Sequence, residues 1–558
     1  MNKKLLSHML TSLLVGAMTV GILAGCGSRD TNEKSKESES QTGKSPALEA
    51  TSNVSAEPQE ITYPLADAEE VSWFVVNQLG LHSEYTEASQ SPFHSGLSEM
   101  TGVSIDWQFV PQGADSGQTL QLLIQEEDCP NIIFWSGFKA SKAQEYYKEG
   151  LIYDLTEYLP IYAPDYWEFI NLPENAENLQ MLKDGEGRLL TIGSFKESDY
   201  CITYLGPVVR KDWLEECGLD MPVTVQDWEE VLVTFKEKYN ATLGFTLNRF
   251  NNAGFASGTG AFAPLKLKYY VDDDNRIQLA NACPEWKEFL EVMNRWYEMG
   301  LIDKDFATAD DTTMRAKALN NEIGASFTAM SQITNWLADA QTEGTGAEWV
   351  AAEYLREAEG QPTNYIYTTR NTLDGGNAAV ISTTASEEQL ITALKLLNYG
   401  FTEEGRMYWN FGKEGVSYEL DENGTPQFTE LVTGDVNGIN AGVQKYTGVH
   451  SAGACVQTEA YAHAKYAPYG DFVYTWVENT EAAKHCVPSD LPATDEETTL
   501  ISDLETPIST YINEMALKFV TGEESLDNFD KYVEKLNEMD LAELLEVKNA
   551  AYVRYQGN

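Results

Sequence analysis

The chain has 558 residues, of which 87 are Asp or Glu and 38 are Lys or Arg, so its formal net charge at pH 7 is −49. This charge repels nucleic acid, anionic lipid and polyanionic ligands, and no Arg/Lys cluster outside the extreme N-terminus of the sequence counters it. With 42% hydrophobic residues, a chain of this length can form two to four domains or one large two-lobed body, and neutral ligands are the favoured class.

The first residues read as a secretory signal. Two lysines open a short basic region, residues 5–23 are apolar, and the run ends in small residues before Cys26. The sequence LAGC at residues 23–26 resembles the lipobox of bacterial lipoproteins, in which the cysteine is lipidated and becomes the first residue of the mature chain. An ordinary signal followed by a chance cysteine is the alternative. We therefore expect a signal peptide over residues 1–25 and a lipid anchor on Cys26.

The next segment, residues 27–60, contains no aromatic and few aliphatic side chains. Such a composition cannot bury enough apolar surface to fold, so residues 26–60 are expected to form a lipidated, disordered tether. A flexible coil of this length spans roughly 30 Å. Beyond the tether no segment has eighteen unbroken apolar residues, and a further membrane-spanning helix is therefore not expected.

Metal and redox signals are weak. Seven cysteines occur and none forms a CxxC pair, so a structural zinc site is not expected. Asp272-Asp273-Asp274 form an acidic run in an expected hairpin turn, but the central glycine and closing glutamate of an EF-hand loop are missing. We expect no metal and no cofactor. Besides Cys26, the sequence leaves open whether disulfides join Cys129, Cys201, Cys217, Cys283, Cys455 and Cys486.

Short apolar strands alternate with helices between residues 71 and 150. The expected strands are residues 71–76, 103–110 and 131–135, and the expected helices are residues 93–100, 119–126 and 142–149. This alternation predicts a parallel α/β sheet. Ligands of such sheets bind beyond the carboxyl ends of the strands, and Trp135 stands at one of these ends.

The remainder of the chain also mixes strands and helices. Further strands are expected at residues 202–210, 268–271, 277–279, 323–330 and 378–382. Further helices are expected at residues 211–217, 225–239, 284–299, 500–520, 526–539 and 541–554. Thr224, and Ser386 with Gln389, are typical helix N-terminal residues. No period of 20–50 residues repeats, which excludes a solenoid.

Residues 401–418, FTEEGRMYWNFGKEGVSY, combine aromatic side chains with glycines and glutamates. Thr402 caps an expected helix, and Glu403 and Glu404 lie where the helix dipole favours anions, which gives both a structural role. Glu414 lies in the following loop, where polar residues more often carry function. Glu414 is therefore the candidate ligand-binding residue of this stretch.

Several segments, taken in order, resemble extracellular solute-binding protein family 1, the substrate-binding proteins of carbohydrate ABC transporters. The resemblance is greatest to the lipoprotein branch found in Gram-positive bacteria. The matching segments are GLIYDLTEYLPIYAPDY at 150–166, VVRKDWLEECGLDMPVTVQDWEEVL at 208–232, FLEVMNRWYEMGLIDKDF at 289–306, the stretch at 401–418, and TYINEMALKFVTGEESLDNFDKYVEKLNEMDLAELLEVKNAAYVRY at 510–555.

The resemblance implies an α/β, two-lobe fold of the periplasmic-binding-protein type, with crossing hinge strands and a ligand cleft between the lobes. It implies a first lobe of residues 61–203 plus 383–435 and a second lobe of residues 204–382 plus 436–558. The implied partners are a mono- or oligosaccharide and the permease subunits of an ABC transporter. The implied location is the extracellular face of the cell membrane, through the lipid anchor.

The segment NIIFWSGF at residues 131–138 resembles a maltodextrin-binding segment whose tryptophan stacks on sugar, and that tryptophan matches Trp135. The acidic residue that follows it in those proteins is not matched, because Phe138 stands near its place. A pyranose has an apolar face and a rim of hydroxyls, so aromatic platforms beside planar polar groups are expected. His94, in the turn after the first strand, either donates to such a hydroxyl or simply begins a helix.

Two further sets of residues are expected where the second lobe faces the cleft, with solvated loop residues as the alternative. Arg249, Phe250 and Asn251 follow an expected strand at residues 244–247, and Ser331, Gln332 and Trp336 follow the strand at residues 323–330.

No sequence motif marks an enzyme. The GxSxG, HExxH and GxxxxGK[ST] motifs are absent. Among 87 acidic residues, carboxylate pairs such as a glycoside hydrolase requires arise by chance. We therefore expect a binding protein without catalytic residues. A membrane-anchored glycoside hydrolase and a sensory binding protein that partners a membrane kinase are the alternatives.

Replacement of the lipobox cysteine, Cys26→Ala, should release the protein into the medium or leave its signal uncleaved, because one acylated cysteine provides the membrane attachment. Fractionation of cells and medium, with the intact mass of the product, measures both effects. A variant that stays in the membrane after losing its signal would contradict the lipoprotein hypothesis.

Overall fold

The computed structural model describes most of the chain beyond the expected tether. The described residues are 58–76, 80–111, 114–124, 129–135, 137–251, 254–261, 263–264, 269–366, 373–449, 452–466, 472–477, 485–488 and 490–557. Cys26, the expected signal peptide and nearly all of the expected tether lie outside these residues. Within the described ranges, no helix is both long and apolar enough to cross a membrane.

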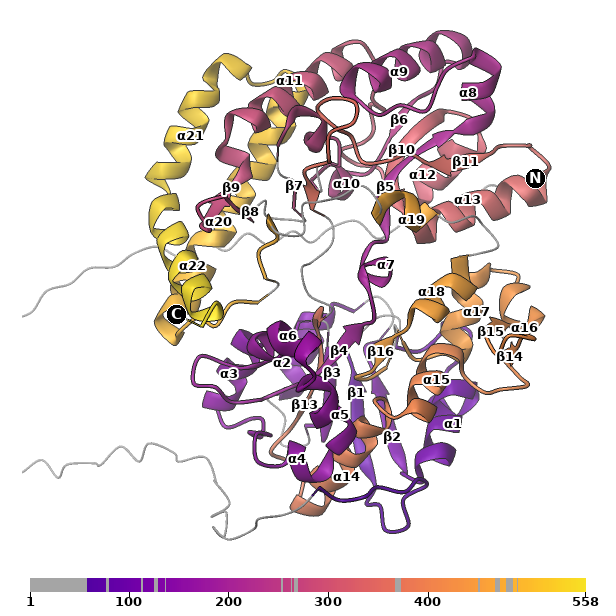
Figure 1. The fold of residues 1–558 in the computed structure, drawn as a ribbon, viewed down its shortest axis with the longest axis vertical. Helices are drawn as coiled ribbons and strands as arrows, with labels where there is room; N and C mark the ends of the chain where they lie inside the picture. Colours follow the sequence, from indigo (N-terminus) through magenta and orange to yellow (C-terminus); the bar gives the residue numbers. More distant parts are fainter. Residues whose placement is uncertain are drawn as a thin grey trace, which may run out of the picture. The chain divides into compact units, whose positions relative to one another are not determined.

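A six-stranded sheet combines early and late parts of the chain (Figure 1). Its order is β16 (Val456–Gln457), β4 (Ile192–Lys196), β13 (Leu373–Ile381), β3 (Ile132–Trp135), β1 (Val71–Val75) and β2 (Ile105–Phe109). β1 is parallel to β2 and to β3, as the alternation of strands and helices predicts. β13 is antiparallel to both β3 and β4, which the alternation does not predict, because this strand joins only after the chain has built a second sheet.

Helices cover both faces of this sheet, which explains the continuously apolar sequence of its inner strand β3. Val71, Trp73 and Val75 point into one core, whereas Phe74 and Ile133 point into another. Alternate residues of a strand therefore hold helices on opposite faces. The first core is shared with α1 (Pro92–Thr101), α14 (Glu387–Tyr399) and α15 (Glu403–Phe411), and the second with α2 (Ser116–Ile124) and α3 (Ala140–Lys148).

A second, four-stranded sheet has the order β11 (Trp349–Ala351), β5 (Leu205–Arg210), β10 (Ile323–Ala329) and β6 (Thr242–Gly244). All seven residues of β10 are buried, and this strand is antiparallel to β5 and parallel to β6. The core around the sheet receives Trp213 and Phe235, whose rings meet edge to face at 5.3 Å. The helices nearby are α8 (Lys211–Cys217), α9 (Val225–Tyr239), α11 (Pro284–Glu298), α12 (Asp311–Leu319) and α13 (Met330–Glu343).

The chain passes between the two sheets repeatedly. It leaves the first sheet after β4, runs through α7 (Asp199–Ile202) and enters the second sheet as β5 (Figure 1). It returns as β13 and, after β16, reaches α19 (Phe472–Val477), where the Trp476 indole donates to the carbonyl of Pro207 in β5 at 3.2 Å. The chain therefore forms two α/β lobes joined by crossing segments, as the resemblance implies.

Two strands belong to a different lobe from the one that the sequence predicted. The prediction assigned residues 373–381 and 456–457 to the second lobe, whereas β13 and β16 pair within the first sheet. Strand pairing joins residues that are far apart in the chain, so neither membership has a local signal in the sequence. The other lobe boundaries stay a prediction.

Helix N-termini follow the predicted capping residues. Thr224 forms a capping box with Asp227 at the start of α9, and Ser386 forms one with Gln389 at the start of α14. The Gly405 N–H donates to the Thr402 hydroxyl at 3.0 Å at the start of α15. These caps satisfy backbone donors that a helix leaves without intrahelical partners.

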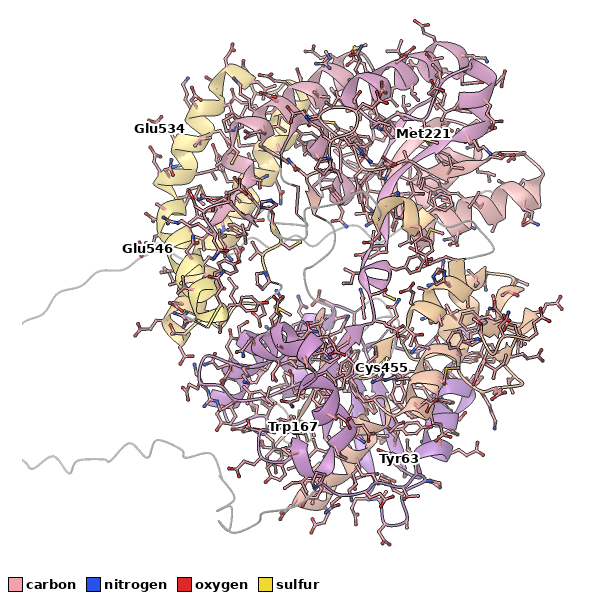
Figure 2. The ribbon with its side chains drawn as sticks, viewed as in Figure 1. Tyr63, Trp167, Met221, Cys455, Glu534 and Glu546 are labelled. Atoms are coloured by element: carbon pink, nitrogen blue, oxygen red, sulfur yellow. The ribbon has the colours of Figure 1, made fainter. Side chains whose placement is uncertain are left out.

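The chain ends in the helices α20 (Asp495–Thr521), α21 (Phe529–Glu538) and α22 (Leu541–Tyr555). α20 begins at Asp495, five residues before the predicted start at residue 500. Its first turn is acidic and capped by Thr494. The prediction missed this turn because it lacks the apolar residues that indicate a helix in the sequence. Glu534 of α21 and Glu546 of α22 are exposed on the outer side of these helices (Figure 2). Such exposed carboxylates contribute to the net charge.

The Asp272 carboxylate serves a turn between β8 (Tyr269–Val271) and β9 (Ile277–Leu279). It accepts hydrogen bonds from the Arg276 N–H at 2.8 Å and from the Gln278 amide at 2.8 Å. Both bonds give this acidic residue a structural role in the hairpin. In the described part of the chain, no three or more His, Cys, Asp and Glu side chains are grouped to hold a metal ion.

Candidate ligand-binding site

Trp135 is the last residue of β3. The three preceding residues of the strand are buried and Trp135 itself is half-buried, so the prediction that it ends a buried strand is confirmed. Its ring meets that of Phe138 edge to face at 5.4 Å, and a Cβ atom added at Gly137 would lie 2.6 Å from the ring. The glycine therefore leaves the space that the indole occupies. Contact of this ring with a ligand stays a prediction.

The carboxyl ends of several strands meet at one edge of the first sheet. β3 and β4 are both antiparallel to β13, and β16 is parallel to β4. Trp135 at the end of β3 therefore lies on the same edge as Lys196 at the end of β4 and Gln457 at the end of β16. Residues that follow these strands are placed where α/β proteins bind their ligands.

Five side chains gather at this edge beside the connection from β4 to β5. We refer to Ser198, Tyr200, Glu459, His463 and Tyr474 as the hinge cluster. Tyr200 lies in α7, Glu459 and His463 lie in α18 (Glu459–Tyr466), and Tyr474 lies in α19. The cluster therefore draws on three segments that adjoin the passages of the chain between the sheets.

The aromatic rings of the hinge cluster are in contact. The Tyr200 ring stacks on the His463 ring, with centroids 4.4 Å apart and 18° between the planes. The Tyr200 centroid also lies 4.6 Å from that of Tyr474, and the Tyr474 hydroxyl is 2.6 Å from His463 Nε2. Tyr200 is only 5% exposed, whereas His463 is half-buried and Tyr474 is 37% exposed, so the cluster presents mainly the Tyr474 ring and the His463 imidazole to solvent.

The polar groups of the hinge cluster are not arranged as a Ser-His-acid triad. The Ser198 hydroxyl donates to Glu459 Oε2 at 2.8 Å, and Glu459 Oε1 is 3.4 Å from His463 Nε2. In a Ser-His-acid triad the histidine accepts the serine proton, whereas here the serine hydroxyl is bonded to the acid. Carboxylate, imidazole and phenol groups beside stacked rings suit the hydroxyls and apolar face of a sugar.

Two of the expected polar residues meet in the second lobe. Arg249 Nη2 is 3.6 Å from Asp311 Oδ2, and the Gln332 amide donates to the same oxygen at 3.3 Å. These residues belong to α10 (Leu247–Asn251), α12 and α13, which follow strands or loops at one edge of the second sheet. Asp311 was missed in the sequence, where it reads only as the first residue of a helix.

The neighbours of Arg249 are placed differently from the expectation. The expected strand at residues 244–247 is wrong: β6 ends at Gly244, and α10 begins at Leu247. A short apolar run fits a strand or a buried helix equally, and here it spans the boundary between them. Phe250 is 4% exposed and packs on Phe289 with centroids 6.2 Å apart, which is a core position. The side chain of Asn251 lies outside the described part of the chain.

The expected residues of α13 also divide between surface and core. The Ser331 carbonyl accepts a hydrogen bond from the Asn440 amide at 3.3 Å, and the same amide donates to the Thr334 hydroxyl at 3.2 Å. Trp336 is 3% exposed and meets Trp349 at 5.0 Å, so it packs in the core of the second sheet. Gln332 is therefore the residue of this set that joins the polar group around Asp311.

His94 is the third residue of α1 and is 2% exposed. Its Nδ1 atom is 2.8 Å from the Ser91 hydroxyl, and its ring meets those of Trp107 at 4.6 Å and Phe109 at 5.4 Å. This packing between α1 and β2 favours the role of a helix-start residue over that of a ligand donor. Burial lowers the pKa of His94 from 6.5 to about 4, so the ring is neutral at pH 7.

Glu414 is exposed in the loop between α15 and β14 (Tyr418–Leu420), and its backbone forms a bridge with Tyr418. The structure places this residue at a local turn of the β14 hairpin.

A cavity beside α3 is too small to hold a sugar, because its volume of about 90 Å³ is far below the several hundred Å³ of typical ligand pockets. It is lined by apolar residues such as Ile133, Phe138 and Val380.

No protein-family model matches the sequence. Lipoprotein LipO of Bacillus subtilis is 24% identical over 355 residues, which cover 61% of this chain and 67% of LipO. The fructooligosaccharide ABC transporter substrate-binding protein FusA of Streptococcus pneumoniae is 26% identical over 250 residues, which cover 42% of this chain and 45% of FusA. The chain is thus similar in sequence to a lipoprotein and to the substrate-binding protein of a sugar ABC transporter. The aligned region spans about two thirds of LipO and less than half of FusA.

Solved structures show the same fold. FusA in complex with kestose has a TM-score of 0.70 and 19% identity, and the match covers 88% of this chain and 100% of that chain. An HMO-binding, ABC-transporter-associated solute-binding protein of Bifidobacterium longum infantis has a TM-score of 0.67 and 17% identity, and the match covers 87% of this chain and 98% of that chain. These likenesses confirm the two-lobe fold. The homologues and structural neighbours are binding proteins of transporters and not enzymes, as the sequence analysis expects.

The buried His94 should make stability depend on pH. The unfolded chain takes up a proton at this residue below pH 6.5, whereas the folded chain does so only near pH 4. Neutral His94 therefore makes its full contribution to the free energy of unfolding above pH 6.5, and this contribution is lost as the pH falls towards 4. Between pH 8 and pH 5 the free energy of unfolding should fall by about 2 kcal/mol through this residue.

Urea unfolding of the wild type and of His94→Phe at pH 8 and pH 5 measures this effect. The phenylalanine keeps the ring contacts but cannot be protonated, so the variant should lose less stability at pH 5 by about the same 2 kcal/mol. Equal losses in the two proteins would show that the histidine is not the group responsible.

Proposed function

We propose that this protein captures a sugar or an oligosaccharide outside the cell and delivers it to an ABC transporter. The observation that carries the proposal is the hinge cluster, in which stacked aromatic rings, a carboxylate and an imidazole lie together where the chain passes between the lobes. The fold is shared with FusA, whose structure contains kestose. The sequence similarity to FusA, an ABC transporter substrate-binding protein, supports a role in uptake rather than in chemistry.

Two surfaces would make the site. In the first lobe, Trp135 and the hinge cluster provide aromatic faces for the apolar side of a pyranose. In the second lobe, the group formed by Arg249, Asp311 and Gln332 provides fixed donors and acceptors for hydroxyls. Binding between the lobes would favour a closed arrangement, which the permease would recognise.

Attachment to the membrane belongs to the same proposal. The lipobox at residues 23–26 supports lipidation of Cys26 and a place on the extracellular face of the cell membrane. The name of LipO as a lipoprotein agrees with this assignment. A tethered protein would meet the permease at high local concentration, because the anchor confines both to one surface.

The binding function is tested by isothermal titration calorimetry of the mature protein against a panel of neutral and acidic oligosaccharides, followed by mass spectrometry of the sugar. A member of the panel should bind and be recovered unchanged after prolonged incubation. Shortened sugar, formed by the wild type and abolished by one carboxylate substitution, would instead assign a hydrolase.

The contribution of Trp135 is tested by Trp135→Ala. Loss of a stacked ring should weaken sugar binding by roughly 1–3 kcal/mol, about 5- to 150-fold, because less apolar area leaves water. The matched control is Trp336→Ala, which removes a core indole and should lower the free energy of unfolding by about 3–5 kcal/mol.

Calorimetry for affinity and thermal unfolding without ligand for stability separate the two tryptophans. Trp135→Ala should change mainly the first quantity and Trp336→Ala mainly the second. Unchanged affinity of a destabilised Trp135→Ala variant would remove this residue from the site.

A further inference from the structure

The helix α17 (Ile439–Tyr446) belongs to the first lobe but is hydrogen-bonded to the second. Its apolar residues share a core with Phe411 of α15. From the same helix, the Asn440 amide donates to the Ser331 carbonyl at 3.3 Å and to the Thr334 hydroxyl at 3.2 Å, and both of these acceptors lie in α13 of the second lobe. We refer to this contact between Asn440 and α13 as the latch.

The loop before α17 is anchored within the first lobe. The Asp435 carboxylate accepts hydrogen bonds from Lys445 Nζ at 2.6 Å and from the Asn437 N–H at 2.8 Å. Lys445 Nζ also lies 2.8 Å from the Glu84 carboxylate, in the segment between β1 and α1. The side chains of Lys445 and Asp435 are only 12% and 7% exposed, so these charge-assisted bonds are shielded from water. Asn440 is therefore held in place relative to the first lobe.

The partner helix α13 is fixed within the second lobe. The ring of its Trp336 meets that of Trp349 in β11 at 5.0 Å. Its Asp339 carboxylate accepts two bonds from Arg315 of α12, at 2.6 and 2.7 Å. The latch thus joins two elements that are each held by their own lobe. A movement that separates α13 from α17 by more than a few tenths of an ångström would break its hydrogen bonds.

The first turn of α13 connects the latch with the proposed site. Gln332, which binds Asp311, directly follows the latch residue Ser331. The contact extends beyond the two hydrogen bonds, since a Cβ atom added at Gly438 would lie 3.6 Å from Asn335 Oδ1. Closure of the latch therefore places the polar group around Asp311 next to the first lobe, while Asn440 is not itself part of that group.

A second contact joins the lobes through α3. The Ser141 N–H and hydroxyl each donate to the Asp490 carboxylate at 3.4 Å, and Lys148 pairs with Asp495 at the start of α20, which packs on α11. In the view of Figure 1, α3 and α17 lie on opposite sides of α7. The two bonds of Ser141 are long, and the side chains of the ion pair are 38% and 52% exposed, so this contact is screened by water. The latch is the better ordered of the two contacts.

We propose that Asn440 is a conformational latch, which holds the two lobes in contact without touching the ligand. Its hydrogen bonds to α13 exist only while the lobes meet, so they favour this arrangement over one in which the lobes are apart. A ligand that binds between the lobes would gain affinity from the latch, because a larger fraction of the protein is ready to bind. The inference concerns the lobes themselves and does not depend on the identity of the ligand.

Small-angle X-ray scattering of the ligand-free mature protein measures the balance between the two arrangements. Asn440→Ala removes the donor, and Asn440→Asp keeps the shape of the side chain but sets a negative oxygen against the Ser331 carbonyl. Loss of two hydrogen bonds should lower the ratio of contacting to separated lobes about tenfold in the alanine variant, and further in the aspartate variant. Both variants should therefore have a larger radius of gyration than the wild type.

Asn437→Ala is the matched control. The Asn437 amide lies three residues before Asn440 but donates to Glu84 within the first lobe, at 3.3 Å, so its loss should leave the radius of gyration unchanged. Thermal unfolding checks the fold of each variant. The melting temperatures should stay near that of the wild type, because the latch lies between the lobes and not within the core of either.

Unchanged scattering of both folded Asn440 variants would overturn the latch, and so would an equal expansion of Asn437→Ala. A large fall in melting temperature without expansion would instead assign Asn440 to the stability of the first lobe. Since no ligand is present in these measurements, none of these results bears on sugar capture, which the calorimetric panel tests separately.

Discussion

The antiparallel pairing of β13 between β3 and β4 is the constraint on which both lobes depend. A strand in the interior of a sheet must find hydrogen-bond partners on both of its sides, so the first sheet is incomplete until the chain returns to it. The strands β5, β6, β10 and β11 are all made before that return. The second sheet is therefore an insertion within the first, and neither can be removed without disturbing the other.

Because helices cover both faces of the first sheet, its polar chemistry is confined to the edges. Trp135 and the residues after β4 and β16 share one such edge, and the group around Asp311 lies at an edge of the second sheet. The interior residues of the same strands make the cores. The residues of the proposed site and the residues of the cores are thus different residues of the same elements.

Local chemistry in the sequence predicted much of this fold. The capping residues Thr224 and Ser386 and the buried run before Trp135 are local signals, and the structure confirms them. The prediction was wrong at residues 244–247, where a short apolar run fits two structures. The hinge cluster had no signal, since its members become neighbours only through β4, β16 and α19. His94 and Trp336 were predicted to contact the ligand, but both side chains are buried. The type of a single residue does not reveal whether its side chain is buried.

The contact between Tyr474 and His463 joins parts that belong to different lobes. α19 is held to β5 through Trp476, whereas the backbone just before α18 is bonded to Asn410 of α15 in the first lobe. The aromatic contact therefore bridges elements that are bonded to different sheets, and a rotation of one lobe against the other would alter it. We refer to this contact as the joint. An evolutionary change of this surface would alter recognition and mobility together, whereas changes at Trp135 or Gln332 would leave the joint untouched. If the proposed site binds the ligand, new specificities should arise more readily at its periphery than at this joint.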